Sequence, residues 1–266
     1  MNNLTIYPTL LIFSFSLLII HCTPLHPQKK TIHFTTQAGA ITRADTANKN
    51  LSIVFTGHEF ADGGEHIVQI LQEQKIKGSF FFTGDFYRNV LFEPLINDLK
   101  NNGHYLGAHS DKHLLYCDWE NRDSLLVSNE LFIDDLENNY TAMQRFDITK
   151  EEAPFFLPPF EWYNDSISVW TKKAGLKLIN FTSGTRSHAD YTTPDMPNYL
   201  NSETIFQSII DYERKDPHGL NGFILLIHIG TAPEREDKFY YKLEELILFL
   251  KNKGYKIERI DKLLDY

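Results

Sequence analysis

The stretch LSIVFTGHEFADGGEHIVQILQEQKIKGSFFFTG, residues 51–84, contains the repeating unit that decides the fold of this chain. It begins with a run of apolar and β-branched residues at 51–57. Apolar residues at helical spacing follow at Ile67, Ile70 and Leu71, and a second apolar run closes the stretch at 78–84. This order is typical of a strand–helix–strand unit with parallel strands.

The same alternation continues to the C-terminus. Further strands are expected at 104–110, 155–160, 176–183, 222–230 and 255–260, and helices at 86–103, 123–146, 165–174, 202–214 and 237–253. The strands are mostly continuous apolar runs, which are typical of strands buried on both faces of a parallel sheet. The pattern predicts an α/β domain with about seven strands, and a barrel or a doubly wound sheet would both fit. We expect the charged residues of the helices at 123–146 and 237–253 to face solvent.

The composition indicates a globular protein and excludes some classes of partner and metal site. The chain has 266 residues, of which 42% are hydrophobic and 14% aromatic, so it can bury a substantial core. Its net charge of −9 argues against a nucleic-acid partner, because phosphate binding needs clustered positive charge. Cys22 and Cys117 are the only cysteines, which excludes a cysteine-rich zinc site. Any metal would have to be held by histidines and carboxylates.

The N-terminus has its own pattern. TLLIFSFSLLII, residues 9–20, is too short to span a bilayer comfortably and has the length of a signal-peptide core. Cys22 follows, as in a bacterial lipoprotein signal, although His21 stands where a small residue is usual. We therefore expect residues 1–22 to be a signal peptide of the lipoprotein type, with lipidation at Cys22. An ordinary secretory signal or a membrane anchor is the alternative.

The expected domain organisation follows from these patterns. Residues 23–50 are polar and irregular and are interpreted as a tether, and residues 51–266 as one catalytic domain. The protein would be exported to the cell envelope of a bacterium. Its contact with the membrane would be limited to the lipid anchor or signal segment.

Histidines collect where the expected strands end. His58 follows the first strand, His109 and His113 follow the third, and His228 ends the strand at 222–230. In parallel α/β folds, sites form at the carboxyl ends of strands. Two histidines four residues apart on a helical turn share one face, so both imidazoles can reach one metal ion. The pattern indicates a metal site.

Several motifs resemble those of the polysaccharide deacetylase family, the carbohydrate esterases that share the NodB homology domain. The resemblance covers about residues 51–260 and rests on GSFFFTGDFYR (78–88), GHYLGAHSDKH (103–113), FFLPPF (155–160) and ILLIHIG (224–230). It implies a distorted (β/α) barrel with about seven parallel strands. It also implies a metal-dependent hydrolase that removes acetyl groups from an acetylated sugar or polysaccharide.

The resemblance assigns roles to individual residues. His58, His109 and His113 would bind the metal, and His228 would be the general acid. The family has two aspartates at the end of the first strand, the first of them the general base. Here Gly57 stands at the base position and His58 at the ligand position, and Leu157 replaces the arginine that holds the base. Three histidines without a carboxylate favour Zn²⁺.

The general base and the substrate contacts stay open at the sequence level. Glu59 and Asp62 are the preferred candidates for the base because they are nearest to the lost aspartate, and Glu161 is a further candidate. Phe160, Glu161 and Trp162 after the proline motif, with Trp119, are expected at the substrate groove. Asp190 is the candidate for the partner that tunes His228.

Two functional hypotheses remain after this assignment. The first is a zinc-dependent deacetylase of a sugar or polysaccharide, with hydrolysis of a non-sugar amide as a variant. The second is a catalytically weakened protein with the same fold that binds glycan without turning it over, which Gly57 and Leu157 favour.

Overall fold

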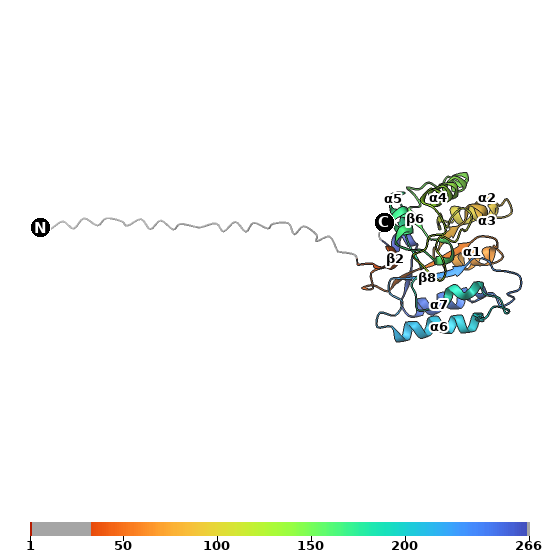
Figure 1. Cartoon of the computed structure of the whole chain (residues 1–266). Helices are drawn as coiled ribbons and strands as arrows, with labels where there is room; N and C mark the ends of the chain where they lie inside the picture. The colour runs from red at the N-terminus through yellow and green to blue at the C-terminus, as the bar shows by residue number, and fades with distance from the viewer. Residues whose placement is uncertain (2–32, 265–266) are drawn as a thin grey trace. The chain divides into compact units, whose positions relative to one another are not determined.

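A curled sheet forms the centre of the molecule, with helices packed around its outside (Figure 1). The computed structural model describes Met1 and residues 33–264. The strands are β1 Thr35–Gln37, β2 Ala40–Arg43, β3 Asn50–Gly57, β4 Ser79–Phe82, β5 Tyr105–Ala108, β6 Phe155–Phe156, β7 Lys177–Leu178, β8 Phe223–His228 and β9 Lys256–Ile257. The helices are α1 Gly64–Glu73, α2 Gly84–Arg88, α3 Glu93–Asn101, α4 Asn129–Met143, α5 Asp165–Lys173, α6 Ser202–Lys215, α7 Leu243–Asn252 and α8 Ile260–Leu263. The 3₁₀ turns are η1 Gln144–Phe146, η2 Pro159–Glu161, η3 Ser187–Tyr191 and η4 Phe239–Lys242.

The strand order confirms the predicted α/β barrel. The sheet runs β1-β2-β8-β3-β4-β5-β6-β7, and β9 pairs with the start of β3. The pairs from β8 through β3 to β7 are all parallel. A bridge between Ile41 and Ile179 joins the end of β7 back to β2. The sheet therefore curls into a distorted barrel, and seven of its strands, β3 to β9, are the parallel strands expected from the sequence.

The central strands are buried because their side chains are apolar on both faces. Seven of the eight residues of β3 are buried, as are all four of β4 and of β5. Phe55 of β3 stacks on Phe80 of β4 with ring centroids 4.8 Å apart. Burial of large aromatic side chains contributes about 1.5–3 kcal/mol each to folding. The core therefore fixes the register of these strands and, with it, the positions of the residues at their carboxyl ends.

Three predicted helices differ in extent from the observed ones. The helix expected at 237–253 begins as the 3₁₀ turn η4 and is α-helical only from Leu243. The helix expected at 86–103 is split into α2 and α3, because Pro94 lacks the N–H that a continuous helix needs and the Asn89 side chain accepts the N–H of Leu91. The helix expected at 123–146 begins only at Asn129. Ser128 ends the preceding loop by accepting the N–H of Leu131, as a helix N-cap does.

The tether prediction is wrong for the described part of residues 23–50. Residues 35–43 form the hairpin of β1 and β2, whose turn has positive φ at Ala38 and Gly39. Arg43 anchors the hairpin, since its buried guanidinium donates to the carbonyls of Asn221 and Gly219 and pairs with Asp216 at 3.5 Å. The ordered domain therefore begins before residue 51.

The signal-peptide and lipidation predictions lie outside the described residues, apart from Met1. Among the residues that the structure describes, no helix is long and apolar enough to cross a membrane.

Candidate functional site

One pocket brings together the histidines from the strand ends. It has a volume of about 460 Å³ and opens at the carboxyl ends of β3, β5 and β8. Its lining includes the four predicted site histidines, His58, His109, His113 and His228, which come from three different strand ends. Histidines as far apart in the sequence as His58 and His228, 170 positions, meet here because parallel strands end at one edge of the barrel.

The His109–His113 segment is a turn, not the helical turn expected from its spacing. Ser110 and His113 both have positive φ, at 73° and 55°. The imidazole of His109 is held by a 2.8 Å hydrogen bond between its Nδ1 and the carbonyl oxygen of Leu157. Because Nδ1 must carry the proton in this bond, the Nε2 lone pair of neutral His109 is left for another partner.

Two side chains of α4 hold this turn in place. Asn139 accepts the N–H of His109 at 2.9 Å and donates to the carbonyl of Phe82. Asp135, one turn earlier, accepts the backbone N–H groups of Asp111 and Lys112 at 3.1 and 3.0 Å. Both side chains are buried, so the expectation that the charges of this helix face solvent is wrong for Asp135. Sequence reasoning missed their role because nothing local distinguishes them from surface residues.

The third predicted ligand, His58, lies against His113. Their ring centroids are 4.8 Å apart with an interplanar angle of 10°, while the rings of His109 and His113 are 5.1 Å apart. The Nδ1 of His58 lies 3.1 Å from the hydroxyl of Thr83, which also caps α2. All three predicted ligands are therefore neighbours.

The donor set suits a metal ion, although the side chains do not form a finished cluster. Burial lowers the pKa of His109 to about 3 and that of His113 to about 2, so both imidazoles are neutral and carry a free lone pair at pH 7. Within the described part of the chain, no three histidine, cysteine or acidic residues are arranged to hold a metal ion. The stacked rings of His58 and His113 present faces to each other, whereas a metal binds in the ring plane. A three-histidine site would require the His58 ring to turn.

His228 and Asp190 form a buried pair in the same pocket. Asp190 of η3 lies with Oδ1 2.6 Å from Nδ1 of His228 and accepts the backbone N–H of His228 through Oδ2. Burial opposes protonation of the imidazole, but the negative charge of Asp190 outweighs it and raises the pKa of His228. The pair is suited to holding a proton on His228 near neutral pH.

The three carboxylates considered as general base have different surroundings. Asp62 does not line the pocket, because its oxygens accept from the N–H of Thr231 and the hydroxyl of Tyr240 and pair with Lys238 at 3.0 Å. Glu59 lines the pocket edge with its side chain 68% exposed, 3.9 Å from Nε2 of His58. Glu161 lines the pocket, and burial raises its pKa to about 7. The structure brings Glu59 and Glu161 to the site and leaves Asp62 outside it.

Aromatic side chains form one rim of the pocket. Phe160 packs on His113 with centroids 4.3 Å apart, and Trp119 meets Phe160 edge-on at 5.7 Å. Trp162 is not among the lining residues. It lies behind Trp119 at 5.5 Å, with Arg122 4.1 Å above its ring. Of the predicted substrate contacts, Phe160 and Glu161 line the pocket, and Trp162 supports Trp119.

A side chain at position 57, where the family has its general base, would not face the pocket. A Cβ on Gly57 would lie 2.8–2.9 Å from side-chain atoms of Ile229, Phe82 and Phe86, closer than carbon atoms pack. Because side chains alternate along a strand, the Thr56 side chain faces the opposite side, beside its register partner His228. Both residues line the pocket, Gly57 without a side chain. A side chain at position 57 would therefore point into the apolar layer.

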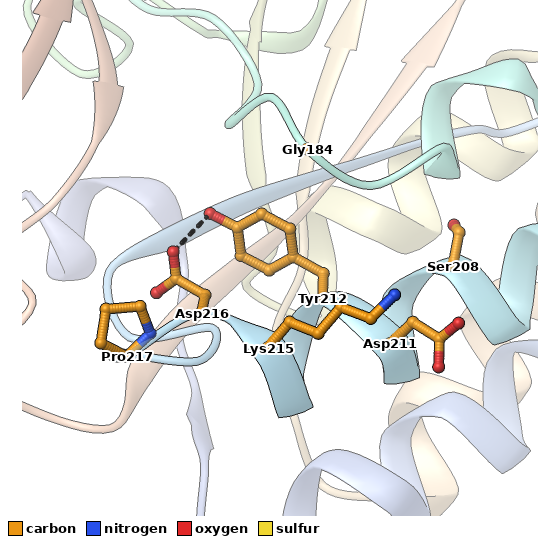
Figure 2. A pocket seen from close by; sticks show the side chains of 7 residues that line it. All are labelled: Gly184, Ser208, Asp211, Tyr212, Lys215, Asp216 and Pro217. Carbon is orange, nitrogen blue, oxygen red and sulfur yellow. Dashed lines mark hydrogen bonds between the residues drawn. The ribbon is translucent and has the colours of Figure 1, made fainter.

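A second hollow lies along α6 and contains no histidine (Figure 2). Its residues are Gly184, Ser208, Asp211, Tyr212, Lys215, Asp216 and Pro217. The hydroxyl of Tyr212 donates to Asp216 at 3.1 Å, and both contact Arg43. These groups are engaged in holding the β1–β2 hairpin, which gives this hollow a structural role.

Fold and site together define an α/β-barrel protein with a histidine-lined pocket at the carboxyl ends of its parallel strands. Residues 43–179, just over half of the chain, match the family model described as polysaccharide deacetylase. The chain belongs to this family, whose deacetylases are generally metal-dependent.

Individual relatives extend the comparison. The chain is 24% identical over 201 residues to the uncharacterised protein YlxY of Bacillus subtilis, covering 76% of this chain and 53% of that protein. The chain thus spans about half the length of this curated relative. It resembles the crystal structure of a CE4 family pseudoenzyme from Bacillus anthracis, with a TM-score of 0.64, 19% identity and coverage of 86% and 70%. It also resembles the chitin deacetylase of Colletotrichum lindemuthianum, with a TM-score of 0.64, 18% identity and coverage of 86% and 93%.

Proposed function

We propose that this protein is a metal-dependent hydrolase that removes acetyl groups from a sugar or polysaccharide. The observation that carries the proposal is the meeting of three neighbouring histidines and a His–Asp pair in one pocket. A metal-binding group beside a proton donor is the combination that hydrolysis of an acetyl amide or ester needs. Family membership supports the same reaction class.

The proposed metal ligands are His58, His109 and His113. Three imidazole ligands would favour Zn²⁺, which would lower the pKa of a bound water and polarise a carbonyl. The carbonyl of Leu157 fixes the tautomer of His109, as the outer partners of metal-bound histidines usually do. Leu157 therefore contributes through its backbone, although its side chain replaces the arginine of the family.

His228 is the proposed general acid. With Nδ1 held by Asp190, a protonated imidazole presents the Nε2 proton to the departing amine or alkoxide. The leaving group takes this proton together with the electron pair of the bond that breaks. Asp190 stabilises the imidazolium before the transfer and keeps the ring oriented afterwards, as carboxylates do in other catalytic pairs.

An acetylated carbohydrate is the proposed substrate. Sugar rings stack on aromatic faces, and the exposed rings of Trp119 and Phe160 stand at the pocket rim. One structural relative is a chitin deacetylase, an enzyme whose substrate has this chemistry. The acetyl group would enter the histidine pocket while the sugar rests on the rim.

Glycan binding without turnover is the second candidate function. It is favoured by Gly57 and Leu157, which replace a base and its partner, and by the similarity to a pseudoenzyme of the same fold. The two candidates differ in whether acetate is released, not in where the glycan binds.

Metal analysis combined with acetate-release assays distinguishes these functions. Purified full-length protein should contain stoichiometric zinc that is lost in His109→Ala. It should release acetate from acetylated glycans, and His228→Ala should retain the zinc but lose this activity. Glycan binding without acetate release would favour the second candidate, and absence of metal from the wild-type protein would overturn the ligand assignment.

Export to the bacterial envelope with a lipid on Cys22 is proposed from the N-terminal sequence alone. Mass spectrometry of the protein extracted from the cells that make it would test this, since lipidation adds acyl chains to the peptide that begins at Cys22.

A further inference from the structure

Glu161 has an unusual position among the acidic residues of the pocket. Within the described chain, Glu59 and Glu161 are the carboxylates that line it, and Glu59 is mostly in solvent. The carboxylate of Glu161 forms no hydrogen bond or ion pair with any described residue, and only the backbone carbonyl of Glu161 accepts a hydrogen bond, from the side chain of Asn180. A half-buried acidic group without a protein partner is available to a ligand or a water molecule.

The Glu161 side chain is held in the pocket by a backbone turn with an unfavourable conformation. Phe160 and Glu161 both have positive φ, at 58° and 52°, which is unfavourable for residues other than glycine. The turn is fixed by the N–H of Glu161, which donates to Pro158, and by Asn180, which donates to the carbonyl of Glu161 at 2.8 Å. Backbone strain of this kind persists where the surroundings enforce it, and it clusters at functional sites.

The electrostatic surroundings suit proton transfer. Burial raises the pKa of Glu161 to about 7, with His228 of β8 lowering it and Asp190 of η3 raising it further. The histidines after β5 also face the pocket, and Glu59 stands at its edge. A base whose pKa is close to the working pH is the most effective one.

The floor of the pocket has a second unsatisfied polar group. Thr56 is 1% exposed, and its hydroxyl has no hydrogen-bond partner among the described residues. It lies in register with His228 on the strand beside it. Buried hydroxyls are almost always satisfied, so a polar ligand or water is expected next to Thr56.

We propose that Glu161 is the general base of the hydrolysis and takes the role that the family gives to a carboxylate on the first strand. The inference rests on the proposed deacetylase function. Glu161 takes a proton from water as the water oxygen forms a bond to the acetyl carbon, and the π pair of the carbonyl moves to its oxygen. When that pair returns, the bond from carbon to the sugar nitrogen or oxygen breaks. The departing atom keeps the bonding electrons and takes the proton of His228, so water and the acetylated sugar give acetic acid and the free amine or hydroxyl. The acetic acid ionises to acetate, and the proton held by Glu161 returns to His228 through solvent.

Substitution of Glu161 with chemical rescue tests this role. In the full-length, metal-loaded protein, Glu161→Gln should lower kcat by about 10²–10⁴-fold. The dissociation constant for an acetylated chito-oligosaccharide, measured by calorimetry, should change less than threefold (~0.65 kcal/mol). Formate should restore part of the activity of Glu161→Ala, because it can fill the space and accept the proton. Glu203→Gln, on the outer helix α6 with its side chain 68% exposed, is the control with unchanged rate.

The outcomes separate this inference from the proposed function. Wild-type acetate release with an equally active Glu161→Gln, or loss of activity on Glu59→Gln instead, would overturn the role of Glu161 and leave the deacetylase intact. Rate loss without formate rescue and with lost glycan binding would make Glu161 a binding residue. A wild-type protein that releases no acetate would overturn both.

Discussion

The environment of Gly57 yields the most direct prediction about how this protein departs from its family. Restoring the family aspartate by Gly57→Asp should destabilise the protein and should not increase acetate release. The new Cβ would meet Ile229, Phe82 and Phe86 at 2.8–2.9 Å, and all three side chains are fully buried. They would have to move by about half an ångström to reach ordinary contact distance.

The expected loss of folding stability follows from these contacts. Overpacking by a methyl group costs about 1–3 kcal/mol, and a carboxyl group without a partner in an apolar layer adds about 1–3 kcal/mol. We therefore expect Gly57→Asp to lower the free energy of unfolding by about 2–6 kcal/mol. Gly57→Ala adds only the methyl group and should lower it by about 1–3 kcal/mol. With an m-value of about 3 kcal/mol/M, the urea midpoint of the aspartate variant should fall by about 1–2 M.

Urea unfolding followed by tryptophan fluorescence measures this loss. Thr56→Asp is the matched comparison, because the neighbouring side chain faces the pocket and not the apolar layer. It should be the less destabilised of the two. An unchanged midpoint for Gly57→Asp, or a gain in acetate release, would refute the reasoning from side-chain direction.

Three further predictions concern the site. Asn139→Leu should weaken zinc binding about tenfold in a chelator competition and cost about 1–2 kcal/mol of stability, because the N–H of His109 keeps only its second contact, with Phe82. Asp190→Asn should lower the pKa of His228 in an NMR titration, since the charge that raises it is removed. The raised folded-state pKa means that this pair stabilises the fold fully below about pH 6.5 and that the contribution is lost as the pH rises through the pKa of folded His228. Trp119→Ala should raise KM by about 5–30-fold with little change in kcat, because an exposed rim residue contributes to binding and not to the bond-breaking step.

Controls make these outcomes interpretable. Asn102→Ala removes exposed hydrogen bonds from the residue after α3 to Asp98 and should leave zinc binding unchanged. Equal zinc affinity in Asn139→Leu, an unshifted His228 titration in Asp190→Asn, or a fall in kcat alone for Trp119→Ala would each contradict the role described for that residue.

The fold could be predicted because its signals are local. The apolar run at 51–57 and the helical spacing after it determine β3 and α1 without reference to the rest of the chain. The hairpin at 35–43 gave no such signal. Its first strand is three exposed polar residues that pair with β2, and β2 in turn pairs with β8 at Arg43.

The site could be predicted only in part. His109, His113 and His228 were identifiable because each stands at the end of a strand whose position is predictable. The surroundings of the carboxylates were not, because they depend on distant residues. Asp62 accepts a hydrogen bond from Tyr240, and Glu161 reaches the pocket through a strained turn held by Asn180. No pattern around either acidic residue indicates these partners.

Acetate release by the metal-loaded protein tests the central claim most directly. Full-length protein with one zinc per chain should release acetate from an acetylated chito-oligosaccharide, lose this activity with a chelator and regain it on addition of zinc. His109→Ala should neither bind zinc nor release acetate. Zinc-loaded wild-type protein that binds the oligosaccharide and releases no acetate would contradict the claim and identify the pocket as a binding site alone.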